Sequence, residues 1–135
     1  MSIRTKRISF IMAIVMLSVL SLTVAFAAVQ TWAVKDSDGN PYTCYLKVTY
    51  NTVLGIKTSK EATGILVRSF DDGMTATLYT ELYSYNGSKI VDKDLTSSQA
   101  TRVESTLSKV NKSYTIFCHY FSGWGLDKTY SEADL

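Results

Sequence analysis

Residues 113–125 read Ser-Tyr-Thr-Ile-Phe-Cys-His-Tyr-Phe-Ser-Gly-Trp-Gly. This segment concentrates aromatic residues and contains the only histidine of the chain and the second of its two cysteines. Aromatic and β-branched residues favour strands, in which successive side chains point to opposite faces. We therefore expect a central strand here, with Cys118 on one face and His119 on the other.

Two upstream segments alternate in the same way. Residues 42–50 place the other cysteine, Cys44, on an apolar face, and residues 74–85 form the longest alternating run. The dipeptide Asn86-Gly87 follows, which is typical of a type I′ hairpin because both central residues need positive φ. The predicted return strand is 88–92, with Tyr85 opposite Ser88 and Tyr83 opposite Ile90.

The rest of the chain after residue 27 is also mostly β in character, and its only proline is Pro41. Residues 96–112 fit either a strand or a helix, because apolar residues recur at helical spacing among many Thr, Ser and Val residues. The other expectations are a strand at 28–34, a turn at 35–41, a loop with a short strand near 53–57 inside 51–64, a strand at 65–70, a turn at 71–73 and a frayed polar tail at 126–135.

The N-terminus has the features of a secretory signal peptide, which forms a helix. A basic start with Arg4, Lys6 and Arg7 precedes the apolar residues 8–22, and Ala25-Phe26-Ala27 is an A-x-A cleavage pattern. We expect residues 1–27 to be removed after Ala27 and residues 28–135 to form one secreted domain. The alternative is an uncleaved membrane anchor, since the apolar stretch is nearly long enough to span a bilayer. The short basic start and long apolar core suit a bacterial exported protein.

Charge argues against an anionic partner. The full chain has 14 Lys and Arg against 12 Asp and Glu, and cleavage after Ala27 removes three basic and no acidic residues, which leaves 11 against 12. A domain of net charge near −1 is not expected to bind nucleic acid, or a membrane surface once the signal peptide is gone.

The two cysteines predict a disulfide, Cys44–Cys118, because exported proteins retain such bonds. Two free thiols or an intermolecular bridge are the alternatives. A bond between these strands would require both cysteines to face the core.

The faces opposite the cysteines then form a second aromatic set. In one interpretation this set is buried by loops or the tail. In the other it is an exposed surface for a protein, peptide or glycan ligand, because rigid aromatic rings contribute much of the energy of recognition. The candidate binding surface consists of Tyr45, Tyr79, Tyr83, Phe117, His119 and Phe121.

Catalytic and metal sites are not predicted. Cys118 and His119 are adjacent and therefore point to opposite faces, which rules out a thiol–imidazole dyad. One histidine cannot build a His-rich zinc site, and no cofactor motif is present. The sequence thus predicts a small secreted, all-β, antiparallel sandwich of about six to eight strands that acts as a non-enzymatic extracellular binding module. The alternatives are a small secreted antagonist, such as a bacteriocin-like toxin acting on a competitor's envelope, and a hydrolase that uses His119.

Overall fold

The computed structural model of the protein describes residues 23–69 and 76–135. This part of the chain is all-β apart from one turn of 3-10 helix near the C-terminus, and it contains no helix long and apolar enough to cross a membrane. In chain order its elements are β1 (Thr23–Lys35), β2 (Pro41–Val53), β3 (Ile56–Arg68), β4 (Leu78–Asn86), β5 (Lys89–Ser98), β6 (Arg102–Asn111), β7 (Thr115–Ser122), β8 (Asp127–Ser131) and η1 (Glu132–Asp134).

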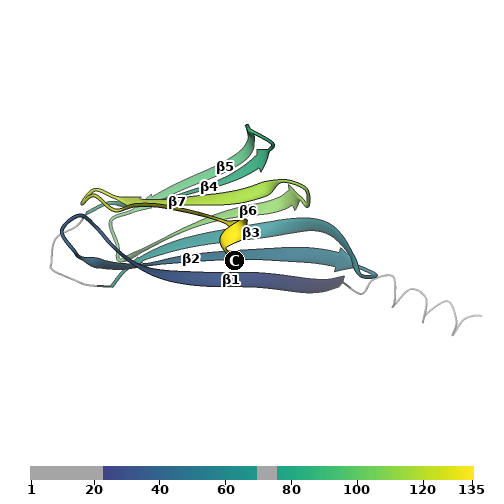
Figure 1. Ribbon diagram of the computed structural model, residues 1–135, viewed down its shortest axis with the longest axis horizontal. Helices are drawn as coiled ribbons and strands as arrows, with labels where there is room; N and C mark the ends of the chain where they lie inside the picture. The colour runs from purple at the N-terminus through teal and green to yellow at the C-terminus, as the bar shows by residue number, and fades with distance from the viewer. Residues whose placement is uncertain (1–22, 70–75) are drawn as a thin grey trace, which may run out of the picture.

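The strands form two antiparallel sheets of four. Sheet A has the order β1-β2-β3-β6, and sheet B has the order β5-β4-β7-β8 (Figure 1). The expected antiparallel sandwich is confirmed, and the described residues alone supply eight strands. The central strand expected from residues 113–125 is β7, which lies between β4 and β8 inside sheet B.

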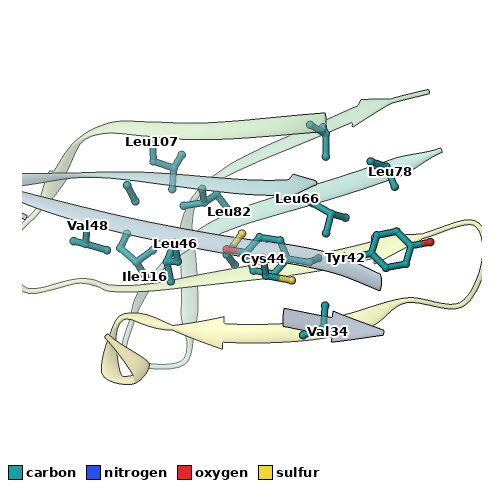
Figure 2. Close-up of a cluster of buried hydrophobic side chains, with 14 of the residues drawn as sticks. Val34, Tyr42, Cys44, Leu46, Val48, Leu66, Leu78, Leu82, Leu107 and Ile116 are labelled. Carbon is teal, nitrogen blue, oxygen red and sulfur yellow. The ribbon is translucent and has the colours of Figure 1, made fainter. Parts of the chain in front are cut away.

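The core lies between the sheets and is built from alternate residues of the inner strands. Leu46 of β2, Leu66 of β3, Leu82 of β4 and Ile116 of β7 are fully buried (Figure 2). Each such side chain stabilises the fold by about 1.5–3 kcal/mol relative to an exposed one. The alternation in the sequence thus predicted the inward faces of these strands correctly.

The predicted disulfide is absent. Cys44 and Cys118 both face the core, as expected, but both are free thiols. They belong to opposite sheets, Cys44 to β2 of sheet A and Cys118 to β7 of sheet B. The Cys118 sulfur lies instead over Gly64 of β3, where an added Cβ would come within 2.4 Å of it.

Residues 96–112 contain strands, so the helical alternative is wrong. The end of β5 and the whole of β6 lie here, and Val103, Ser105 and Leu107 alternate into the core. The three-residue spacing between Leu107 and Val110, which suggested a helix, arises from a bulge. Lys109 has a φ of 54°, and the register of β6 against β3 shifts so that Val110 rather than Lys109 points inward.

Two turns differ from the expectation. The predicted loop at 51–64 is a tight turn at Leu54-Gly55, with φ values of 51° and 79°, between long strands that include the charged residues. The β4–β5 hairpin is confirmed, but its pairs are Asn86 with Lys89 and Tyr85 with Ile90, so the turn is one residue later than predicted. Of the two turn residues, Gly87 and Ser88, only Gly87 has positive φ, which is the pattern of a type II′ turn.

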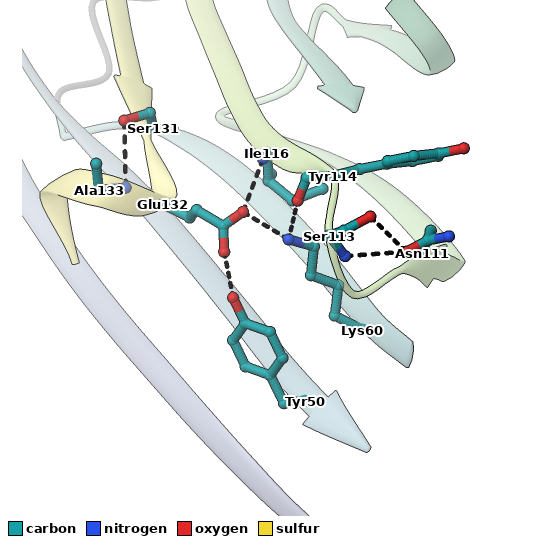
Figure 3. Close-up of polar contacts among 9 residues, drawn as sticks. All are labelled: Tyr50, Lys60, Asn111, Ser113, Tyr114, Ile116, Ser131, Glu132 and Ala133. Atoms are coloured by element: carbon teal, nitrogen blue, oxygen red, sulfur yellow. Dashed lines mark hydrogen bonds and ion pairs between the residues drawn. The ribbon is translucent and has the colours of Figure 1, made fainter. Parts of the chain in front are cut away.

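The C-terminal residues are ordered rather than frayed. β8 pairs with β7, and η1 brings Glu132 over the end of the sandwich, where it accepts hydrogen bonds from the Lys60 Nζ at 2.6 Å, the Ile116 amide at 3.0 Å and the Tyr50 hydroxyl (Figure 3). The Lys60 side chain is 2% exposed and also donates to the Tyr114 carbonyl. This long-range ion pair holds the last residues against the domain.

The predicted signal peptide stays a prediction. Residues 1–22 lie outside the described part, as do the turn expected at 71–73 and the first residues of the run at 74–85. β1 begins at Thr23, so its first residues, which include the proposed cleavage position at Ala27, pair with the end of β2.

Candidate binding surface

The outer face of sheet B brings together five of the six predicted surface residues. β4 and β7 are antiparallel neighbours, and their register pairs Tyr79 with Phe121, Glu81 with His119 and Tyr83 with Phe117. The intervening residues of both strands point into the core, so these six side chains share the outward face. All six are partly exposed.

Tyr45 lies elsewhere, which corrects the prediction. It is in β2, paired with Thr31 and Ile65, and therefore projects from the outer face of sheet A. The sequence showed that Tyr45 is opposite Cys44, but it could not show that β2 and β7 belong to different sheets. The backbone carbonyl of Tyr45 accepts a hydrogen bond from the Tyr120 hydroxyl of sheet B at 2.6 Å.

The rings form two contiguous groups. Tyr79, Phe121 and His119 make a continuous stack, with centroid distances of 4.5 Å between the first two and 4.6 Å between the last two. Beside it, Phe117 meets Tyr85 at 5.1 Å with planes 76° apart, and Tyr83 lies 6.2 Å from Tyr85. Cross-strand aromatic pairs of this kind stabilise sheets and also fix the rings in place.

Polar groups cross the middle of this aromatic face. His119 Nε2 lies 2.6 Å from an oxygen of Asp127 on β8, and its Nδ1 lies 3.5 Å from an oxygen of Glu81 on β4. Glu81 also accepts a hydrogen bond from the Tyr83 hydroxyl and lies 3.6 Å from the Lys93 Nζ on β5. The side chain of Asp127 is 78% exposed, so it can accept further hydrogen bonds from a ligand.

A groove of about 580 Å³ opens next to these groups. Its lining residues come from β4, β7, the β4–β5 turn, the start of β5 and β8. The lining residues are Tyr83, Tyr85, Gly87, Ser88, Ile90, Phe117, His119 and Thr129. Predominantly apolar walls with a few polar groups are typical of small-molecule sites.

The sequence missed several members of this surface. Glu81 could have been found, because the alternation in 74–85 places it between Tyr79 and Tyr83 on one face. Asp127 and Thr129 could not, since they reach the surface only through the pairing of β8 with β7.

The cysteines take no part in the surface. Cys118 is fully buried while its neighbour His119 points outward, which confirms that the two cannot form a dyad. Burial raises the pKa of both the Cys44 and Cys118 thiols to about 12. Thiols with such pKa values are poor nucleophiles at neutral pH.

The acidic turn between β1 and β2 is also structural. Both oxygens of the buried Asp36 accept hydrogen bonds, from the backbone amides of Asp38 and Asn40 and from the side chains of Asn40 and Tyr42. Burial alone would raise the pKa of Asp36, but these hydrogen bonds outweigh it and lower the pKa. Across the described residues, no group of three or more His, Cys, Asp and Glu side chains is arranged to hold a metal ion.

The chain matches no protein-family model, no curated protein and no solved structure. Its function therefore has to be argued from the geometry of the surface itself.

Proposed function

We propose that the protein is an exported, non-enzymatic module that binds a carbohydrate in the groove on the outer face of sheet B. The observation that carries this proposal is the groove itself, in which aromatic rings lie beside the His119 imidazole. The carboxylates of Glu81 and Asp127 contact this imidazole from positions next to the groove. A sugar ring has apolar C–H faces and a rim of hydroxyl groups, and it needs both kinds of partner.

Phe117 and Tyr85 supply the apolar contacts. Their planes are nearly perpendicular, so the groove presents rings in two orientations to a ligand. Both rings are held by neighbours in the sheet, which reduces the entropy lost when a ligand binds. Aromatic residues in such central positions account for much of the affinity of binding sites.

Asp127 and His119 supply the polar contacts. A carboxylate accepts hydrogen bonds from hydroxyl groups, and such charge-assisted bonds are stronger than neutral ones. Because Asp127 is mostly exposed while Glu81 is 14% exposed, Asp127 is the residue that a ligand reaches directly. Glu81 then orients the imidazole from the other side.

A flat peptide or protein partner fits this site less well. The groove is confined to one part of this face, and the Gly87-Ser88 turn forms part of its lining. Its volume suits a ligand of one or two sugar rings, since small-molecule sites commonly enclose roughly 300–1,000 Å³.

The test is a glycan array followed by calorimetry with the best-bound oligosaccharide. Removal of a central aromatic anchor costs about 2 kcal/mol or more, so Phe117→Ala is expected to weaken binding by at least about 30-fold. Tyr45→Ala is the matched control, because Tyr45 is an equally half-exposed aromatic residue on the opposite sheet. Absence of any bound glycan, or an equal loss in both variants, would disprove the proposal.

A further inference from the structure

The turn between β2 and β3 is an exposed apolar tip. Leu54 is 60% exposed and Ile56 is 64% exposed, and no other large apolar side chain among residues 27–69 and 76–135 is as exposed as these two. Two such residues, on either side of Gly55 at the end of a hairpin, expose an apolar surface that water solvates poorly.

The backbone of the turn is unfavourable for these residues. Leu54 has a φ of 51°, in the left-handed region where glycine, asparagine and aspartate are the usual residues. A leucine there costs about 1 kcal/mol or more relative to glycine. In water a polar turn residue would relieve both this strain and the exposure, so an apolar side chain fits an apolar environment.

The tip projects beyond the rest of the sandwich. The pairing of β3 with β6 ends at Ser59 opposite Asn111, so residues 56–58 extend past β6. On the other side of the hairpin, β1 begins at Thr23, directly opposite Val53. Figure 1 shows β1, β2 and β3 running together to this end of the molecule.

The chain before β1 indicates what lies at this end. Residues 8–22 form the most apolar stretch of the sequence and join β1 at Thr23, whose partner Val53 precedes Leu54. Because residues 8–22 are joined covalently to β1 opposite Val53, a membrane that holds them is tethered close to the β2–β3 tip. The tip would then meet the lipid surface with its two apolar side chains.

Positive charge near the tip also favours a membrane surface as its partner. Lys57 follows Ile56, is exposed, and lies with its Nζ 4.1 Å from the centre of the Tyr50 ring. Lys112, in the turn between β6 and β7, is at the same end of the sandwich. Lysine and tyrosine next to apolar side chains are typical of segments at the level of anionic lipid headgroups.

We infer that this end of the domain rests on an anionic phospholipid bilayer, with Leu54 and Ile56 below the headgroups and Lys57 among them. The inference uses no residue of the carbohydrate groove and does not depend on the proposed function. It differs from the expectation of a domain that leaves the membrane after cleavage, because the tip itself provides an interfacial contact.

The test uses the full chain in phosphatidylcholine vesicles that contain about a quarter of phosphatidylglycerol. An Ile56→Cys variant is labelled with a polarity-sensitive fluorophore under native conditions at neutral pH, where the buried native thiols, with pKa values of about 12, do not react. Leu54→Cys provides a second reporter at the tip. Leu95→Cys is the control, since Leu95 is an apolar residue on β5 with 51% exposure.

The expected result is a shift of the tip reporters to shorter wavelength and at least about two-fold quenching by a nitroxide placed high on the acyl chain, the depth to which interfacial apolar residues insert. The Leu95 reporter should show neither effect. Tip reporters that behave like the Leu95 reporter would overturn the inference. A wavelength shift without nitroxide quenching would also overturn it, because it would mean that the tip is covered by a second copy of the chain.

Discussion

The ion pair between Lys60 and Glu132 should contribute strongly to stability, because it holds the C-terminal residues against the rest of the domain. Glu132→Gln leaves the Lys60 ammonium, which is 2% exposed, without its counter-charge. Breaking a buried pair in this way typically costs about 3–5 kcal/mol. Because Lys60 keeps the Tyr114 carbonyl and Glu132 is itself 16% exposed, we expect the lower end, about 3 kcal/mol.

The double variant Lys60→Met/Glu132→Gln separates the lost charge pair from the lost contacts. It removes the unpaired ammonium, while the amide oxygen of the new glutamine side chain can still accept from the Ile116 amide. We expect it to recover at least about 1 kcal/mol relative to Glu132→Gln alone, since an apolar replacement of a buried pair is often close to neutral. Urea unfolding at constant ionic strength measures each free energy of unfolding.

The control is the surface pair Arg102–Glu104, whose side chains are 55% and 41% exposed. Exposed pairs contribute about 0–1 kcal/mol, so Glu104→Gln should change the free energy of unfolding little. One contrary result is that Glu132→Gln lowers the free energy of unfolding no more than Glu104→Gln, and another is that the double variant is less stable than Glu132→Gln. Either result would show that the Lys60–Glu132 pair does not hold η1 against the domain in the way described.

Three further outcomes follow from the core. Gly64→Ala places a Cβ 2.4 Å from the Cys118 sulfur and should cost about 1–3 kcal/mol in urea unfolding, whereas Thr63→Ala on the outward face should cost less. Cys44 and Cys118 should react with a thiol reagent only after unfolding, and both should do so without reductant; one or no reactive thiol would contradict the free-thiol core. The raised pKa values of these thiols and of the partly buried Tyr50 hydroxyl, each about 12, keep protons on the folded state that the unfolded chain releases. Stability should therefore be intact below about pH 8.5 and fall as the pH rises towards 12; a flat profile would refute this.

Local alternation predicted which residues face the core and which face outward. It placed Cys44 and Cys118 inward and Phe117, His119 and Phe121 outward, because side chains alternate along a strand whatever its partners are. Alternation could not predict which strands pair with each other. Tyr45 and Phe117 have similar local patterns, yet they lie on opposite outer faces, because sheet membership is decided by long-range pairing.

The same limit explains the other errors. The polar residues 127–131 have the composition of a disordered tail, yet they pair as β8 with β7. This pairing brings Asp127 to His119. The disulfide failed because facing inward is necessary for a bond but does not bring the sulfurs together. The three-residue spacing of Leu107 and Val110 was produced by a bulge at Lys109, and local propensity does not reveal such a bulge.

If a carbohydrate binds against the outer face of sheet B, as we propose, the imidazole of His119 senses the binding directly. It is the only histidine in the chain, so its ring proton signals need no assignment in a proton NMR spectrum. Titration with the best-bound oligosaccharide should move these signals in a saturable way, with the same dissociation constant that calorimetry gives. Saturable binding that leaves the His119 signals unmoved would mean that the carbohydrate binds elsewhere on the protein, contrary to the proposed site.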